Sequence, residues 1–247
     1  PAATTRVGNY TQIMRKTLIL SDTLETVDKA GRRSELAYQL AKRGSEMKRD
    51  LEAISLAAQA GAAGDSSTAR TFAGLNAWLK TNVDKASDGV DPTYTSGVPG
   101  AARTDGTQRD LTETIAKSVL ESGWTNGANF STLMVGPVNK QRVSEDFAGI
   151  VTRNFDVSRP QPMAAIAAVD VYVHDFGTLR VVPNRFQREK DAWFLDFEYT
   201  EFRFLRPLSQ MVLAKTGDAE KRMMIQEVTL CVKNEAALGL AADLNVT

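Results

Sequence analysis

Few residues of this 247-residue sequence could act as a nucleophile, a general base or a soft metal ligand, because it contains one histidine and one cysteine. His174 stands beside Asp175 at a predicted turn, and a catalytic base would also need a nucleophile and an orienting group. We therefore interpret His174 as a turn residue that makes a local hydrogen bond. Cys231 lies in an apolar run typical of a strand, which predicts a buried, unreactive thiol without an internal disulfide.

Carboxylates are the remaining route to a metal site. Asp84, Asp88 and Asp91 lie in a stretch rich in glycine and proline, and such side chains could hold a divalent cation for a hydrolase or nuclease. Solvated loop charges explain the same pattern, and the sequence has neither a calcium-loop spacing nor a phosphate-binding glycine loop nor a G-x-S-x-G elbow. We expect no enzyme activity, cofactor or metal site, and keep the metal-dependent hydrolase as an alternative.

The charge balance narrows the classes of partner. Lysine and arginine together number 30, as do aspartate and glutamate, so the formal net charge is zero. A dedicated nucleic-acid-binding domain usually carries a basic excess, so that class is excluded. Zero net charge also removes the repulsion that keeps copies of a protein apart, and so permits self-association. No run of about 18 apolar residues is present, which predicts the absence of a membrane span.

The first 60 residues predict an extended ribbon followed by a long helix. Residues 5–20 mix β-branched, aromatic and charged side chains, so neither face is apolar and the chain alone would bury this ribbon poorly. After a capping-box spacing at 22–25, the long helix is predicted over 34–60, about 40 Å at ~1.5 Å per residue. Its apolar residues recur on one face: Leu36, Leu40, Met47, Leu51 and Ile54.

The rest of the sequence predicts shorter helices, a long loop and, late in the chain, antiparallel strands, so the fold class is α+β. The helices are predicted over 73–81, 110–123 and 137–148, and the long loop over 82–107. The strands are predicted over 130–135, in a hairpin at 169–182, and over 192–197, 202–205 and 221–232, before an alanine-rich segment at 236–244. The late aromatic residues are expected in the core: Phe186, Trp193, Phe194, Phe197, Tyr199, Phe202 and Phe204.

Several stretches spread over nearly the whole chain carry a resemblance to a known family. They are Gly8–Thr17, Lys29–Gly44, Arg103–Gln108, Met134–Lys140, Phe176–Gln187, Leu205–Pro207 and Leu213–Lys221. In these stretches, and in the order of its predicted elements, the chain resembles the major capsid proteins of tailed double-stranded DNA phages with the HK97-type fold. It is similar in particular to the family of the elongated-head podovirus SU10. The resemblance implies an HK97-like α+β fold with a P-domain, an A-domain and a partial E-loop.

The resemblance also implies a domain map. Residues 1–20 would be the returning E-loop strand, and residues 21–64 the part of the P-domain that contains its spine helix. Residues 65–190 would form the A-domain, residues 191–235 the P-domain strands, and residues 236–247 a return to the A-domain. Family members carry an N-terminal arm and the first E-loop strand before this point, so the arm is expected to be absent from this chain.

Two groups of side chains are candidates for contacts between copies of the chain. By the resemblance, the ribbon would lie across a neighbouring subunit. The charge pattern itself makes the basic residues on and before the long helix candidates for ion pairs between subunits. The candidates are Tyr10, Ile13, Arg15, Lys16, Arg32, Arg33, Lys42 and Arg43. The ordinary interpretation of the basic residues is a solvated helix face with ion pairs along the helix, and loose phosphate contact is a third interpretation.

The function implied by the resemblance is assembly, without enzyme activity. Many copies would form pentamers and hexamers of an icosahedral or elongated head enclosing double-stranded DNA, with scaffold, portal and decoration proteins as further partners. Contact with the packaged DNA would be weak and non-specific, since the net charge is zero. The protein would be made in the bacterial cytoplasm, which the single cysteine fits, and would end in the virion. A decoration or tail protein is the nearest alternative.

Overall fold

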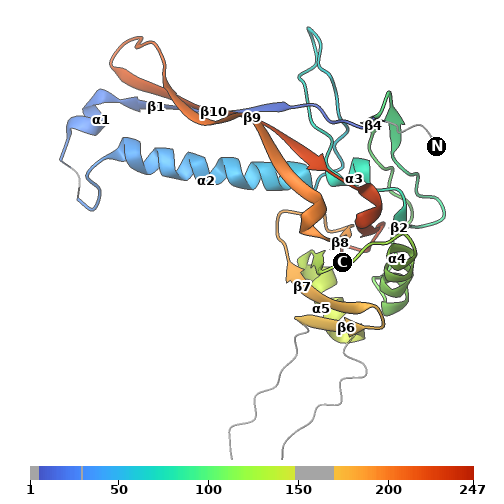
Figure 1. Cartoon of the computed structure of the whole chain (residues 1–247). Helices are drawn as coiled ribbons and strands as arrows, with labels where there is room; N and C mark the ends of the chain where they lie inside the picture. Colours follow the sequence, from blue (N-terminus) through green and yellow to red (C-terminus); the bar gives the residue numbers. More distant parts are fainter. Residues whose placement is uncertain (1–5, 29, 148–169) are drawn as a thin grey trace, which may run out of the picture. The chain divides into compact units, whose positions relative to one another are not determined.

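The computed structural model describes residues 6–28, 30–147 and 170–247, and the chain divides into two compact units (Figure 1). The first unit contains the residues up to Ala77, together with Thr93–Ala102 and Glu201–Cys231. The second unit contains Trp78–Pro92, Arg103–Thr200 and Val232–Thr247. Each unit is therefore built from segments that are distant in the sequence.

A three-stranded sheet of order β1–β10–β9 belongs to the first unit. Strand β1 (Gln12–Ser21) pairs antiparallel with β10 (Ala219–Val232), and β9 (Thr200–Val212) forms the other edge. Met14 and Leu18 on β1 are buried while their sequence neighbours are exposed or half-buried, as the two-residue period of a strand requires. The extended ribbon is thus confirmed over Gln12–Leu20, but its own chain buries one face, contrary to expectation.

Helix α2 (Glu35–Ser55) packs against β1 and is the long helix predicted from the apolar period (Figure 1). Ser34 caps its start by accepting a hydrogen bond from the backbone of Ala37, and Met47 and Leu51 are buried on the apolar face. The helix ends five residues before the predicted Ala60. Beyond Ser55, Gln59 donates hydrogen bonds to Gln12 and to the carbonyl of Phe72, and these contacts hold the segment outside the helix.

The acidic residue of the predicted capping box has a different role from the one expected. Helix α1 (Asp22–Thr26) begins after Ser21, whose side chain makes no capping hydrogen bond. The Glu25 carboxylate instead accepts hydrogen bonds from the Ser34 hydroxyl at 2.6 Å and from the Glu35 backbone at 3.1 Å. The carboxylate of α1 therefore satisfies donors at the start of α2, where the helix dipole favours a negative charge.

The predicted long loop over 82–107 is wrong in part, because it contains three short strands. They are β2 (Asn82–Asp84), β3 (Thr93–Thr95) and β4 (Val98–Ala101). In the first unit, β3 and β4 form a hairpin whose connection, Ser96 and Gly97, has positive φ at both residues, as a two-residue turn of the primed type requires. Strands of three or four residues leave too short a pattern to be recognised in sequence.

A six-stranded mixed sheet of order β2–β11–β8–β5–β7–β6 forms the second unit. Its further strands are β11 (Gly239–Ala241), β8 (Ala192–Leu195), β5 (Thr132–Val135), β7 (Gly177–Pro183) and β6 (Val171–His174). The helices are α3 (Leu75–Trp78, at the junction of the units in the sequence), α4 (Glu113–Thr125) and α5 (Pro137–Asp146), with short 3-10 turns at Phe197–Tyr199 and Glu235–Ala237. The predicted hairpin is confirmed as β6–β7, whereas Val169 and Ala148 lie outside the described residues.

The core of the second unit lies between this sheet and its helices, and all four residues of β8 are buried. Thr112, rather than the predicted Asp110, caps α4 by accepting from Ile115. Gly123 lies inside α4 instead of ending it. A Cβ at this glycine would come within 2.2 Å of the Phe130 ring, so the absence of a side chain lets the helix approach that core residue.

The late aromatic residues are divided between the core and the surface, contrary to expectation. Trp193 and Phe194 are buried as predicted, but Phe197, Phe202 and Phe204 are exposed. Residues 191–235 contribute to two sheets, since β8 belongs to the six-stranded sheet while β10 belongs to the three-stranded sheet. Within the described parts of the chain, no helix has both the length and the apolar character needed to cross a bilayer.

Candidate functional site

The residues that could do chemistry are occupied by local contacts. The ring Nδ1 of His174 accepts a hydrogen bond from the Phe176 backbone at 3.2 Å, which confirms the turn interpretation, and burial lowers the pKa of this histidine. Cys231 is half-buried rather than buried. A half-buried thiol in a strand, with no partner cysteine in the chain, offers no metal or disulfide site.

The three aspartates of the alternative metal site each bind a different partner within the second unit. Arg109 forms an ion pair with Asp84 at 2.5 Å, Lys85 with Asp91 at 2.6 Å, and the Thr107 hydroxyl donates to Asp88 at 2.7 Å. In residues 6–28, 30–147 and 170–247, no three histidine, cysteine or acidic residues are grouped to hold a metal ion. The carboxylates of these three aspartates therefore form local contacts that stabilise the second unit.

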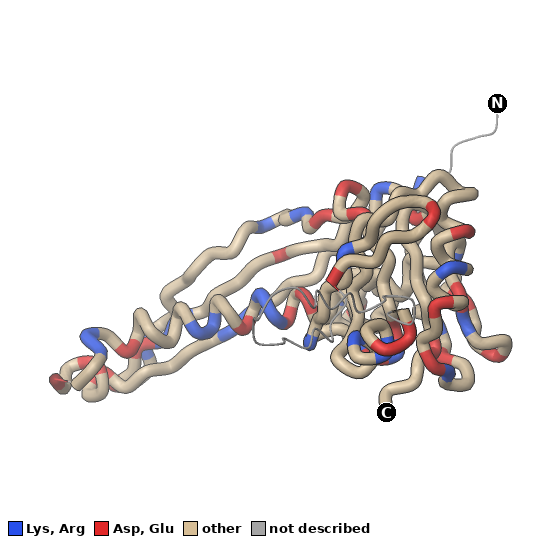
Figure 2. The backbone as a smooth tube through the Cα atoms, turned by 90° about the horizontal axis from the view of Figure 1, so that it is seen from below, with Lys and Arg blue, Asp and Glu red and all other residues tan. Residues whose placement is uncertain are grey.

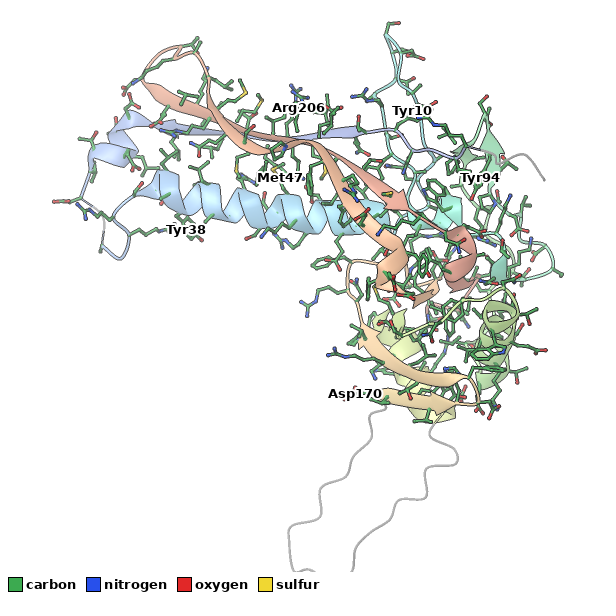
Figure 3. All side chains as sticks on the ribbon, in the orientation of Figure 1. Tyr10, Tyr38, Met47, Tyr94, Asp170 and Arg206 are labelled. Atoms are coloured by element: carbon green, nitrogen blue, oxygen red, sulfur yellow. The ribbon has the colours of Figure 1, made fainter. Side chains whose placement is uncertain are left out.

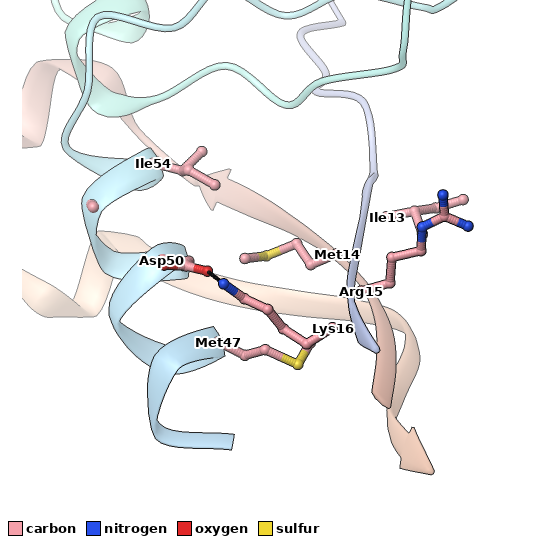
Figure 4. Close-up of a pocket in the computed structure, with 8 residues that line it drawn as sticks. Ile13, Met14, Arg15, Lys16, Met47, Asp50 and Ile54 are labelled. Carbon is pink, nitrogen blue, oxygen red and sulfur yellow. Dashed lines mark ion pairs between the residues drawn. The ribbon is translucent and has the colours of Figure 1, made fainter. Parts of the chain in front are cut away.

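Strand β1 separates its candidate residues onto two sides (Figure 4). Met14 and Lys16 point toward α2, and the Lys16 ammonium forms an ion pair with Asp50 at 2.7 Å. Ile13 and Arg15 point away from α2, and the Ile13 side chain is 47% exposed. Tyr10, before the strand, is half-buried, and its carbonyl accepts a hydrogen bond from Thr229. Of the four, Ile13 and Arg15 are presented outward.

A groove of about 470 Å³ runs between β1 and α2 in the first unit (Figure 4). Its lining is mostly apolar, with the Lys16–Asp50 ion pair across it. It is bounded by residues of β1, of which Met14 and Lys16 point toward α2, and by residues of α2: Ile13, Met14, Arg15, Lys16, Met47, Asp50, Ala53 and Ile54. No group in it combines a nucleophile with a base, so the groove has the character of a packing surface rather than of an active site.

The basic candidates near α2 also divide into two sets. Arg32 forms an ion pair with Glu35 at 3.2 Å, and its guanidinium lies 4.2 Å from the centre of the Tyr38 ring. Arg43 forms an ion pair with Glu46 at 2.6 Å, and this hydrogen bond holds the pKa of the Glu46 carboxyl below its usual value. Arg33 and Lys42 are exposed and form no ion pair with another described residue. The solvated-face interpretation therefore fits Arg32 and Arg43.

The start of β1 is held by side-chain hydrogen bonds that sequence reasoning missed. The Asn9 amide donates to the carbonyls of Ala73 and Leu230 at 3.1 and 2.9 Å, and the Asn9 side-chain oxygen accepts from the Ala73 backbone. The Gln12 side chain accepts from Gln59 at 2.9 Å. These residues are distant in sequence, so no local pattern could reveal the contacts. They fix the start of the ribbon within the first unit.

Glu227 of β10 was also missed, although it is a buried carboxylate with 4% of its surface exposed. It accepts hydrogen bonds from Thr11 at 2.6 Å and Arg206 at 2.9 Å, and forms an ion pair with Arg70. The Thr11 hydrogen bond, together with both arginines, holds the pKa of Glu227 below its usual value. Figure 3 shows Arg206 on the side of the sheet away from α2. The signal in the sequence is a charged residue in the middle of an apolar strand pattern.

Comparison with known proteins identifies the family to which this chain belongs. A family model described as SU10 major capsid protein matches residues 1–245. The chain belongs to the SU10 major capsid protein family. The major capsid protein of Escherichia phage Phieco32 is 29% identical over 266 residues, which cover 94% of this chain and 74% of that protein.

Solved structures show the same fold at low sequence identity. The cyanophage A-1(L) capsid matches with a TM-score of 0.63 and 12% identity, covering 97% of this capsid protein and 78% of that chain. The SrpI encapsulin of Synechococcus elongatus matches with a TM-score of 0.57 and 10% identity over 96% of this chain and 75% of that one. The satellite phage P4 procapsid matches with a TM-score of 0.55 and 13% identity, over 100% and 76% of the respective chains.

The capsid protein is therefore a structural, non-enzymatic protein of the virion, and it assembles into the shell of a phage head. Its α+β, HK97-like fold and its capsid function, both predicted from the resemblance, are confirmed. Family membership decides against the decoration or tail protein and against the metal-dependent hydrolase. The domain map and the eight contact residues stay predictions.

Proposed function

We propose that β1 is the strand with which one capsid protein holds its neighbour in the shell. The proposal is carried by the division of its side chains, since Met14 and Lys16 bind inward to the subunit while Ile13 and Arg15 point outward. An exposed isoleucine beside an arginine offers apolar area together with a planar charged group, both of which are frequent at interfaces. The hydrogen bonds of Asn9 and Gln12 support a fixed direction for this strand.

The two units correspond, in this proposal, to the two domains of the HK97-type subunit. The first unit, with the long helix α2 beside a three-stranded sheet, is the P-domain with its spine helix, and β1 is its E-loop strand. The second unit, with the six-stranded sheet, is the A-domain. Strand β8 then belongs to the A-domain, which changes the domain map drawn from the sequence.

The partners proposed for this chain are other copies of itself and the proteins with which a phage head is built. We propose pentamers and hexamers of the capsid protein, joined by interfaces that are individually weak and collectively strong because they recur around closed symmetry. The likeness to the P4 procapsid, whose structure includes a size determination protein, supports a separate protein that sets the size of the shell. Scaffold, portal and decoration proteins complete the proposed set.

Contact with the packaged DNA is proposed to be weak and non-specific. Basic and acidic positions are interspersed along the backbone (Figure 2), and their numbers balance at 30 each. Affinity for a phosphate backbone depends on an excess of lysine and arginine, which this chain lacks. Of the basic candidates, Arg33 and Lys42 are the ones proposed for ion pairs between copies, because Lys16, Arg32 and Arg43 are neutralised within the subunit.

Replacement of both outward residues of β1, Ile13→Ser with Arg15→Ser, tests the proposed clamp. The subunit should stay folded, since neither side chain is buried. The yield of shells should fall by about tenfold or more, because losing ~1.4 kcal/mol at each contact is tenfold in an equilibrium constant and the contact is repeated across the shell. Circular dichroism measures folding, and negative-stain microscopy with light scattering measures shells.

The matched control is Ile13→Val with Arg15→Lys, which keeps the apolar area and the charge and should assemble normally. Shells in normal yield from the serine variant would show that β1 does not clamp a neighbour.

A further inference from the structure

Strand β9 carries a second exposed surface, and it is more apolar than that of β1. Every residue from Phe202 to Val212 is exposed. The large apolar side chains among them are between 38% and 68% exposed: Phe202, Phe204, Leu205, Leu208, Met211 and Val212. Because successive side chains of a strand point to opposite faces, these residues make both faces of β9 apolar. So many exposed large apolar side chains on one strand are uncommon on a protein that works as a single copy, and usually mark an interaction site.

The position of β9 explains why its own chain leaves it uncovered. Helix α2 packs against β1, at the opposite edge of the three-stranded sheet. β9 is an edge strand, so it presents both faces as well as one edge to solvent. Pro207, near its middle, has no backbone N–H and interrupts a ladder of hydrogen bonds to another strand. The exposed side chains on both faces of β9 are therefore the larger part of the surface that it offers to a partner.

The charged residues of β9 indicate what kind of surface binds this strand. Arg203 forms an ion pair with Glu201 at 2.6 Å, and Arg206 binds the buried Glu227 at 2.9 Å. Both arginines of the strand thus have carboxylate partners in the same subunit, and Arg206 shares Glu227 with Arg70. A surface that held phosphate groups would leave such cations without carboxylate partners. The combination of apolar side chains and paired arginines suits burial against another apolar protein surface.

We propose that β9 docks against a second copy of this chain in the shell, as a side-chain interface distinct from the β1 contact. The shell supplies copies of the chain at every subunit boundary, and zero net charge lets two copies approach without repulsion. At about 3.3 Å per residue, the 13 residues of β9 extend over roughly 40 Å, long enough to form the apolar centre of a standard interface.

Site-specific photo-cross-linking tests the identity of the partner. A benzophenone amino acid in place of Phe204 keeps an aromatic side chain at that position and reports what lies beside it in assembled shells. Irradiation should join two copies of the capsid protein, and mass spectrometry of the joined peptides should find sequence of this chain on both sides. Well-formed shells without joined copies, or adducts with nucleic acid or with a different virion protein, would overturn the proposal.

A pair of substitutions gives an independent readout. Leu205→Ser with Val212→Ser removes apolar surface from two exposed positions and should reduce the yield of shells about tenfold or more while the subunit stays folded. Leu205→Met with Val212→Ile keeps the apolar area and should assemble normally. If the serine variant assembles as well as this control, the β9 interface is refuted, whereas the β1 clamp is judged separately by its own variants.

Discussion

Glu227 shows how a single buried side chain organises the first unit. Its carboxylate binds Thr11 ahead of β1, Arg206 on β9, and Arg70 in the segment that follows α2. A buried charge without partners is costly, so the three segments and the carboxylate depend on one another. Because Glu227 also pairs with Arg206 of the β9 surface, removing its charge would alter two things. It would weaken the hydrogen bond to Thr11 that anchors the chain before β1, and it would change the electrostatics of β9.

Replacement Glu227→Gln should make unfolding less sensitive to acid. A carboxyl whose pKa is lowered on folding contributes stability above its ordinary value of 4.5 and loses that contribution as the pH falls through the folded value. The wild-type unfolding temperature should therefore fall toward that of the variant as the pH drops below about 4.5. Calorimetry between neutral pH and pH 3 measures the difference between the two. A constant difference over that range would contradict the assigned role.

Among the secondary structure elements, the junction between α1 and α2 depends on a few polar atoms. Glu25 accepts from the Ser34 hydroxyl and from two backbone N–H groups, of Glu35 and Leu36, while the Ser34 oxygen accepts from Ala37. The first turn of α2 is thereby supplied with acceptors for its unpaired donors. The long helix consequently begins at a defined residue, which fixes the register of its buried residues Met47 and Leu51 beneath β1.

Replacement Ser34→Ala removes this cap and should lower the free energy of unfolding by about 1 kcal/mol. The matched control is Ser45→Ala, an exposed position within the helix where the serine hydroxyl donates to the carbonyl of Ala41. Alanine has the higher helix propensity, so the control should be neutral or slightly stabilising. Urea unfolding followed by circular dichroism compares the two, and equal effects would show that Ser34 is not a cap.

Elements with a long periodic pattern could be predicted from sequence, whereas those defined by distant contacts could not. The period of α2 and the alternation in β10 were sufficient to find them, but the early end of α2 depends on Gln59 reaching Gln12 and Phe72. β9 was predicted over only four residues because the alternation of apolar and polar side chains breaks where Leu205 follows Phe204. Ile13 and Arg15 were predicted together with Tyr10 and Lys16 as contacts between copies, without a division into inward and outward residues. The Lys16–Asp50 ion pair joins positions too far apart in sequence for any pattern to show.

For the whole molecule, the balance of charge sets how assembly responds to salt. Thirty basic and thirty acidic residues give no net charge, and many of them form ion pairs within one subunit. Copies of the chain therefore meet without a long-range repulsion that salt could screen. The apolar surface of β9 and the exposed Ile13 are insensitive to screening as well.

The rate and yield of shell formation should change by less than about tenfold between low and high ionic strength at pH 7. Light scattering of the full chain at a series of sodium chloride concentrations measures both quantities. The Arg33→Gln with Lys42→Gln variant identifies any remaining dependence on salt that comes from these two cations. A steep acceleration of the wild type by salt would instead indicate repulsion between local patches of like charge.

The pairing of β1 with β10 also determines when β1 can fold during synthesis. The two strands are separated by about 200 residues of chain, and closing so long a loop is slow compared with forming local contacts. During synthesis β1 leaves the ribosome before β10, which follows about 200 residues later. The ribbon therefore stays unpaired until β10 has been made, and a chain cut before β10 cannot form this pair. We expect such a chain to lack a fixed position for β1, so that only subunits made through β10 should enter the growing lattice.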